Sequence, residues 1–151
     1  MSELTPFDDK LAGLIGALSP ASRRRLAADI AKELRRSQQQ RIRQQKAPDG
    51  TPYQARKRQP LRAKKGRIKR VMFQKLRTSR YMKTVNRNDT AVVTFTDKVQ
   101  HIARVHQFGL MDRPFPKHPE VKYEIRELLG FDKVSLRIIT DNVLKSLEEN
   151  I

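Results

Sequence analysis

Cysteine is absent from this 151-residue sequence, so the chain can form neither a disulfide framework nor a thiolate metal site. Tryptophan is absent as well, and the six glycines are isolated, which excludes the glycine-rich loops that cradle phosphates. No apolar run approaches the roughly 20 residues needed to span a bilayer. The sequence begins MSELTPFDDK, with acids where a signal peptide has basic residues. We therefore expect a soluble protein made inside the cell, with no membrane partner.

Acidic residues are nearly absent from one internal stretch. Residues 35–88 hold 19 Lys or Arg and one acid, Asp49, which gives a charge of +18. The remaining residues hold 14 basic and 15 acidic side chains, or −1, so the two parts add to the formal charge of +17. Cations are rarely buried unpaired, so this stretch must face water or a partner. Such asymmetry predicts contact with nucleic acid, an anionic membrane or an acidic protein.

Apolar residues at helical spacing predict two helices in the first 46 residues. The first helix begins at the capping pair Thr5-Pro6, and the second begins at Pro20. Their apolar stripes are Leu11, Leu14, Ile15 and Leu18 in the first helix, and Leu26, Ile30 and Leu34 in the second. The second helix ends in the run SQQQRIRQQK, where only Ile42 is apolar. We expect this end either to fray or to lie against a partner.

The rest of the chain predicts short elements separated by loops. Residues 47–60 contain a Pro-Asp-Gly turn and form a loop, which 61–66 continues as a basic strap. Strands are expected at 80–85 and 90–96, joined by a turn at 86–89, and one or two helical turns end at Gly109. Three further patterns are a short helix on Ile68, Val71, Met72 and Leu76; a third strand on Val121, Tyr123 and Ile125; and a final helix capped by Asp132 with a stripe of Leu136, Ile139, Val143 and Leu147.

These elements predict an α+β fold, with a small antiparallel sheet of about three strands packed with the long N-terminal helix and the C-terminal amphipathic helix. We expect one domain over residues 1–151. It divides into a helical region at 1–46, a basic proline-rich loop at 47–66 and an α+β body at 67–151. Hydrophobic residues make up only 37% of the chain, so neighbouring copies are expected to complete some of its apolar faces.

No residue pattern predicts catalysis, a metal or a cofactor. His101 and His106 are five residues apart, which turns them about 140° from each other on a helix. His118 stands between prolines, and no nearby carboxylate completes a recognisable ligand spacing. No glycine-framed nucleophile elbow is present. A metal-dependent nuclease is therefore the weakest of the functional hypotheses.

The basic stretch is the candidate binding surface. Its cations interleave with Tyr53, Phe73 and Tyr81, but no zinc finger, basic zipper or helix-turn-helix accompanies them. This pattern leaves two interpretations open: phosphate contact without sequence reading, or a basic surface that faces water or a partner. The candidate partner- or DNA-binding residues are Arg56, Lys57, Arg58, Arg62, Lys64, Lys65, Arg67, Lys69 and Arg70.

Three motifs resemble the phage virion morphogenesis (tail completion) family: PDGTPY at residues 48–53, ARVHQFG at 103–109 and RELLGF at 126–131. The resemblance extends over essentially the whole chain. It implies a protein without catalytic residues that completes or caps the head-proximal end of the tail and mediates head–tail joining, as a ring in the neck. The implied partners are further copies of the chain, with six as one candidate number, tail tube or sheath proteins, head connector proteins and DNA in the lumen. The implied location is the virion, with the host cytoplasm during assembly.

Within these motifs we expect structural roles. The His106 imidazole should satisfy a backbone group, Phe108 should pack, Gly109 should permit a chain reversal, and 126–130 should form a strand-to-helix corner. The structural motif residues are Pro48, Asp49, Gly50, Tyr53, His106, Phe108, Gly109, Arg126 and Gly130.

The basic stretch has two expected uses. An injection conduit must release its DNA, and a fully cationic bore would hold it tightly, so we expect most of residues 35–87 to face acidic proteins. The alternative function is a non-specific DNA-binding module that uses residues 35–88.

Overall fold

The computed structural model describes residues 5–56, 71–87 and 90–150. Among these residues the chain forms two compact units. The first unit comprises 5–36, 84–87, 90–94 and 133–150, and the second comprises 37–56, 71–83 and 95–132. None of the helices in the described part of the chain has the length and apolar character to cross a membrane.

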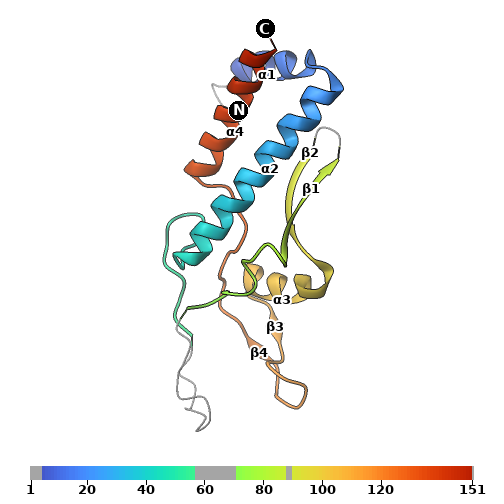
Figure 1. Cartoon of the computed structure of the whole chain (residues 1–151). Helices are drawn as coiled ribbons and strands as arrows, with labels where there is room; N and C mark the ends of the chain where they lie inside the picture. The colour runs from blue at the N-terminus through green and yellow to red at the C-terminus, as the bar shows by residue number, and fades with distance from the viewer. Residues whose placement is uncertain (1–4, 57–70, 88–89, 151) are drawn as a thin grey trace. The chain divides into compact units, whose positions relative to one another are not determined.

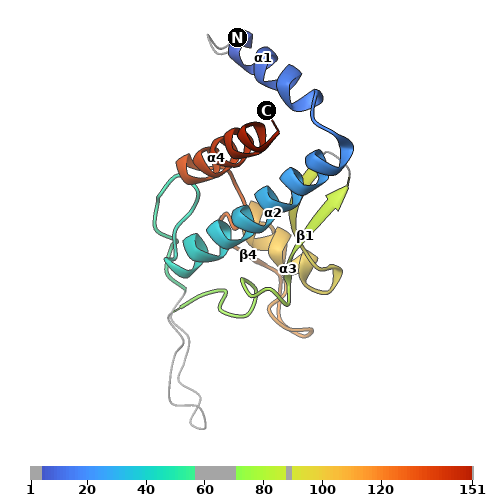
Figure 2. The ribbon, with the colours of Figure 1, turned by 45° about the horizontal axis from the view of Figure 1, so that its top comes forward.

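The first unit is built from helices (Figure 1). Helix α1 spans Thr5–Gly16, and α2 spans Pro20–Arg43, of which residues 20–36 belong to this unit. Ser19 caps α2, because its hydroxyl accepts a hydrogen bond of 3.1 Å from the backbone N–H of Ser22. Helix α4, Lys133–Glu149, lies beside α2 in both Figure 1 and Figure 2. The two predicted N-terminal helices and the final helix are thus confirmed.

A small apolar cluster forms the core of the first unit. Leu18, Leu26 and Val143 are buried at its centre. The half-buried residues packed around them are Leu11, Ile15, Ile30, Ile139 and Leu147. These residues come from the predicted apolar stripes of α1, α2 and α4. Three stripe residues are not in the cluster: Leu34, which is buried elsewhere on α2, and Leu14 and Leu136, which are exposed.

Leu136 does not belong to this core, which corrects the predicted stripe of α4. Its side chain is 62% exposed, whereas Ser135 beside it is fully buried. Positions 135, 139 and 143 follow one another at helical spacing and form the inner face of α4. Leu136 is turned by about 100° from Ser135 and so points outward. Leu14 of α1 is likewise exposed.

The second unit combines α3, Asp97–Phe108, with the pair β3, Met111–Asp112, and β4, Val121–Lys122. The two strands are antiparallel, with Met111 opposite Lys122 and Asp112 opposite Val121. Gly109 ends α3 in the left-handed conformation at φ 63°, and its N–H bonds to the Val105 carbonyl. The predicted stop at Gly109 is therefore confirmed. The third predicted strand exists only as β4 and pairs with β3.

Strands β1, Met82–Arg87, and β2, Thr90–Phe95, form a second two-stranded sheet whose residues are divided between the units. They lie within two residues of the predicted strands, and the end of the predicted turn at 86–89 lies outside the described residues. The α+β class is confirmed, but the predicted sheet of about three strands is two antiparallel pairs.

The short helix predicted around Val71 is wrong over its described part. Residues 71–81 form bends and turns, and Phe73 has a positive φ of 67°, which a helix does not allow. Met72 and Leu76 are nevertheless buried. Their apolar spacing therefore predicted correctly that they are buried, but it predicted the wrong secondary structure. Ile68, which helped to suggest the helix, lies outside the described residues.

We predict that Leu26→Ala lowers the free energy of unfolding by about 2–5 kcal/mol, because it leaves a cavity between α2 and α4. Leu136→Ala is the matched control, since its side chain is mostly exposed and should cost less than about 1 kcal/mol. Urea unfolding of both variants measures the difference. Equal losses would contradict this description of the core.

Candidate functional site

The three sequence motifs meet in the second unit. Residues 123–132 of this unit form neither helix nor strand, so their backbone groups are not paired by regular secondary structure. Leu128 is fully buried at the centre of this segment. Buried backbone N–H and C=O groups need hydrogen-bond partners, so other parts of the unit must supply them.

Two glutamine side chains supply most of these partners. The Gln107 amide oxygen accepts from the N–H groups of Leu128 and Leu129 at 2.8 and 3.0 Å, and its NH₂ group donates to the Leu129 carbonyl at 2.9 Å. Gln38 bonds Gly130 in the same two-way manner, with both distances 3.1 Å. The two amides thus pair with the segment as a neighbouring strand would.

Arg41 completes the support from α2. Its guanidinium donates to the Gln38 amide oxygen at 2.6 Å, to the Lys46 carbonyl at 3.3 Å and to the Leu128 carbonyl. Gln38, Arg41 and the adjacent Ile42 are 5%, 7% and 1% exposed. The expectation that this end of α2 frays or lies against a partner is therefore wrong, because the unit itself buries it.

Motif PDGTPY folds as a tight turn against the same segment. The Asp49 carboxylate accepts from the Thr51 N–H at 2.9 Å, and bonds from Thr51 hold the pKa of Asp49 below its usual value. Gly50 has a φ of 88°, which favours glycine. The ring of Pro48 leaves no room at Gly130, where an added Cβ would lie 2.5 Å from the proline Cγ. These contacts hold the PDGTPY turn against the segment that contains Gly130.

Tyr53 ends that motif and starts a row of rings. Its hydroxyl donates to the Glu127 carbonyl at 2.6 Å, and burial raises the pKa of Tyr53 to about 12. Edge-to-face contacts then link Tyr53 to Phe73, Phe73 to His106 and His106 to Tyr123, with centroid distances of 5.6, 4.9 and 5.3 Å. The row connects the PDGTPY and ARVHQFG motifs to the end of β4.

His106 lies inside this row and is held neutral. Burial and then the positive charges of Arg126 and Arg56 lower the pKa of His106 to about 4. Its backbone carbonyl accepts from the Arg126 N–H at 2.8 Å, but its buried Nδ1 has no hydrogen-bond partner among the residues that the structure describes. The prediction that the imidazole satisfies a backbone group is therefore wrong, because the ring acts through packing.

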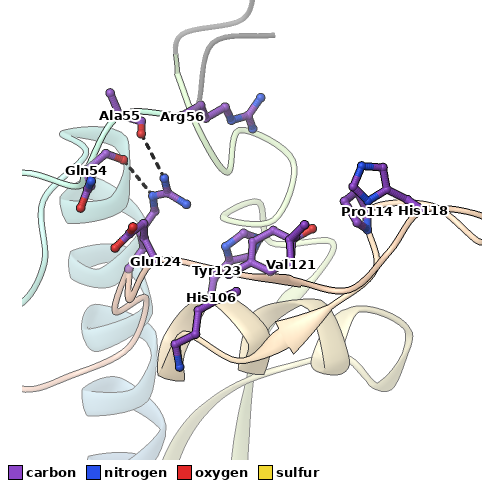
Figure 3. Close-up of a pocket in the computed structure, with 11 residues that line it drawn as sticks. Gln54, Ala55, Arg56, His106, Pro114, His118, Val121, Tyr123 and Glu124 are labelled. Atoms are coloured by element: carbon purple, nitrogen blue, oxygen red, sulfur yellow. Dashed lines mark hydrogen bonds between the residues drawn. The ribbon is translucent and has the colours of Figure 1, made fainter.

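Arg126 anchors the segment that leads into the basic stretch. Its Nε donates to the Gln54 carbonyl at 2.9 Å and its Nη2 to the Ala55 carbonyl at 3.3 Å (dashed in Figure 3). Burial lowers the pKa of Arg126, and the nearby Arg56 lowers it further, while Glu124 opposes the shift. Two bonds use only two of the five N–H groups of a guanidinium.

A pocket of about 440 Å³ opens beside Arg126, with lining residues shown in Figure 3. One wall is formed by residues 54–56, and another by β4 with Tyr123 and Glu124 after it. Pro114 and His118 close the side nearest the loop between β3 and β4. More of the exposed lining is apolar than polar, so the pocket suits an apolar group bordered by charge.

Most of the predicted basic binding residues lie outside the described residues: Lys57, Arg58, Arg62, Lys64, Lys65, Arg67, Lys69 and Arg70. Arg56 is the member that the structure describes; it is exposed and lines the pocket. All nine predicted structural motif residues fall in the second unit. Phe108 is an exception to its predicted role, since it is 58% exposed beneath the Arg104 guanidinium.

Gln38, Arg41 and Gln107 were not among the predicted site residues. A signal for the first two was available in the sequence. The buried face of α2 runs through Ala27, Ala31 and Leu34, and further steps of three or four residues reach Gln38 and Arg41. Because Gln38 and Arg41 are polar, they were not recognised as a continuation of the buried face, although they lie at the same helical spacing.

Two of the histidines have defined surroundings. His101 lies 3.3 Å from the Asp112 carboxylate, and His106 stands in the aromatic row. Within residues 5–56, 71–87 and 90–150, no group of three or more His, Asp or Glu side chains is placed to hold a metal ion.

Comparison with known proteins gives a family for the chain. The phage virion morphogenesis family matches residues 2–148. Tail completion protein S of Escherichia phage P2 is 46% identical over 149 residues, which cover 98% of this chain and 99% of that protein. No solved structure matches the chain.

We predict that Gln38→Ala costs at least about 1–3 kcal/mol of unfolding free energy, because it leaves the Gly130 N–H and C=O without their partner. Gln39→Ala is the matched control. Gln39 makes one exposed bond to the Ser79 hydroxyl, so its loss should change stability by less than about 0.5 kcal/mol. Chemical denaturation measures both. A harmless Gln38→Ala would show that the amide does not support the segment.

We predict that His106 makes stability fall as the pH drops from 6.5 toward 4. The pKa of His106 is lower in the folded state than the usual 6.5, so the unfolded chain binds the proton first. The loss is complete near pH 4 and absent above 6.5. His106→Phe keeps a ring in the row and removes the titration, so it should lose less stability between pH 7 and 4. Identical losses in urea unfolding would contradict the assignment.

Proposed function

The chain belongs to the phage virion morphogenesis family, and on that premise we propose that it is a structural assembly protein that completes a phage tail. The observation that carries the proposal is its 46% identity with a tail completion protein along 98% of its length. In finer form, the protein caps the head-proximal end of the tail and joins tail to head, as a ring of identical subunits in the neck. This role needs no catalysis.

Exposed apolar side chains support the ring. Phe108 and Leu110 flank Gly109, and Ile125 packs directly over it, since an added Cβ would lie 2.6 Å from the Ile125 side chain. Phe108 and Ile125 are 58% and 64% exposed. Soluble monomers rarely leave several large apolar groups together in water. Repeated subunits in a closed ring would bury them.

The basic stretch supports the joining role. Residues 57–70 carry eight Lys or Arg and no acid, and they follow Arg56 in the sequence. An acidic protein surface on the tail or on the head connector would be complementary to this stretch. Non-specific DNA binding through the same cations is the second candidate function, because phosphates offer the same charge.

We predict that Lys64, Lys65, Arg67 and Arg70, all changed to Glu, block head–tail joining while self-association persists. Reversal of four contacts at about 0.5–1 kcal/mol each weakens docking roughly 30- to 1,000-fold. The measurement is complementation of a phage that lacks this protein, read as infectious titre and as unjoined heads and tails in electron micrographs. Light scattering on purified protein reports the subunit number.

The matched control reverses four exposed cations of the first unit: Arg24, Lys32, Lys133 and Arg137. It changes the net charge equally and should leave the titre near wild type. Normal joining by the first variant would refute the assignment to residues 64–70. A monomer whose duplex binding falls steeply with salt, with no ring, would instead favour the DNA-binding module.

A further inference from the structure

We propose that the pocket beside Arg126 binds an acidic peptide segment of a partner protein, which inserts one aromatic or large apolar side chain and places its carboxylates against Arg56 and Lys122. The inference rests on the proposed function in taking that partner to be another component of the particle. It adds a defined receptor site to a role otherwise assigned to the basic stretch as a whole.

The size and lining of the pocket fit a single inserted side chain. Its volume of about 440 Å³ lies in the range of pockets that enclose small organic groups. Ala55, Pro114, Val121 and the Tyr123 ring supply apolar surface. The walls come from three separate segments, namely 54–56, the loop after β3, and β4 with the residues that follow it (Figure 3). A purely ionic ligand would leave the apolar part of this lining without a contact.

The charges around the pocket favour an anion. Arg56, Lys122 and Arg126 are lining cations, and Glu124 is the one carboxylate in the lining. After burial, the charges of Arg126 and Arg56 are the next causes that lower the pKa of His106, which lies in the lining as well. At Arg126 itself, the Glu124 carboxylate opposes the pKa shift more strongly than Arg56 adds to it. A carboxylate brought into the pocket would relieve this repulsion between cations.

The bonds of Arg126 hold it ready for such a ligand. Its Nε and Nη2 donate to the Gln54 and Ala55 carbonyls, which are neutral acceptors. Because carbonyl groups carry no net charge, these bonds do not neutralise the positive charge of Arg126, a residue that is 6% exposed. Charge-assisted bonds to a carboxylate are about twice as strong as neutral ones, so an acidic ligand would gain from a cation already fixed in place.

The lining combines the two kinds of contact that a protein ligand offers. Arg56, Lys122 and Arg126 provide cations, and most of the exposed lining surface is apolar. Duplex DNA offers phosphates for the cations but no protruding apolar group for the interior. The observations favour a protein ligand.

The absence of tryptophan from this chain allows a direct test. The probe is an acetylated, amidated pentapeptide with one Trp between two pairs of Glu, titrated with the full-length protein and followed by Trp fluorescence. We expect saturable binding with a blue shift of the Trp emission, because the indole leaves water. The same peptide with Gln in place of Glu should bind at least about tenfold more weakly, which corresponds to 1.4 kcal/mol.

Two variants test the site by different routes. Ala55→Phe fills the pocket without changing charge and keeps the backbone carbonyl that Arg126 binds; Arg56→Glu reverses an exposed rim cation. Each should weaken peptide binding at least about tenfold. Lys98→Glu, an exposed position on α3 away from the lining, is the matched charge control and should change it less than about twofold. Circular dichroism melting verifies the fold, and Val121→Phe fills the opposite wall should Ala55→Phe destabilise it.

Three results would overturn the proposal. Equal binding of the Glu and Gln peptides removes the acidic ligand, and unchanged binding by both filled-pocket variants removes the pocket. The site would belong to nucleic acid if a DNA duplex displaced the peptide and if the filled-pocket variants also weakened binding of the duplex. Phage complementation separates this inference from the proposed function. Normal titres with Ala55→Phe and lost peptide binding would reject the pocket as a docking site and leave the tail-assembly role standing.

Discussion

The second unit depends on side chains that replace a missing strand. The backbone of residues 128–130 crosses the interior of that unit without a helix or sheet of its own, and each polar group buried there would otherwise carry a desolvation cost. Gln38 and Gln107 satisfy these groups, and Arg41 holds Gln38 in position. Because the amides come from α2 and α3, the same bonds fix both helices against the RELLGF segment and, through Tyr53, the PDGTPY turn.

Periodicity made much of the fold predictable. Apolar spacing gave α1, α2 and α4, and the left-handed requirement at Gly109 gave the end of α3. Leu136 was misassigned because a stripe read from the sequence does not show where the inner face stops. Residues 71–81 were misassigned because buried residues at helical spacing also occur in turns when, as at Phe73, the backbone takes a positive φ.

The candidate site was predictable only in its motif residues. The motif residues from Pro48 to Gly130, which the family resemblance singled out, lie in one unit. What could not be predicted is which polar residues are buried. Gln and Arg are normally exposed. Only the tertiary fold shows that Gln38 and Arg41 are buried and bind backbone groups of residues 128–130. The pocket beside Arg126 likewise forms where residues 54–56 meet residues 114–126, which are distant in sequence.

The bond between Asp49 and Thr51 has a thermodynamic consequence for assembly. Asp49 is the single acid in residues 35–88, and its carboxylate is committed to the turn, so the stretch cannot neutralise its cations from within. Small anions from solution must gather around these cations before assembly. If an acidic surface takes their place, as we propose, those anions return to bulk solution and gain translational entropy. Low salt would then strengthen the proposed docking, and high salt would weaken it.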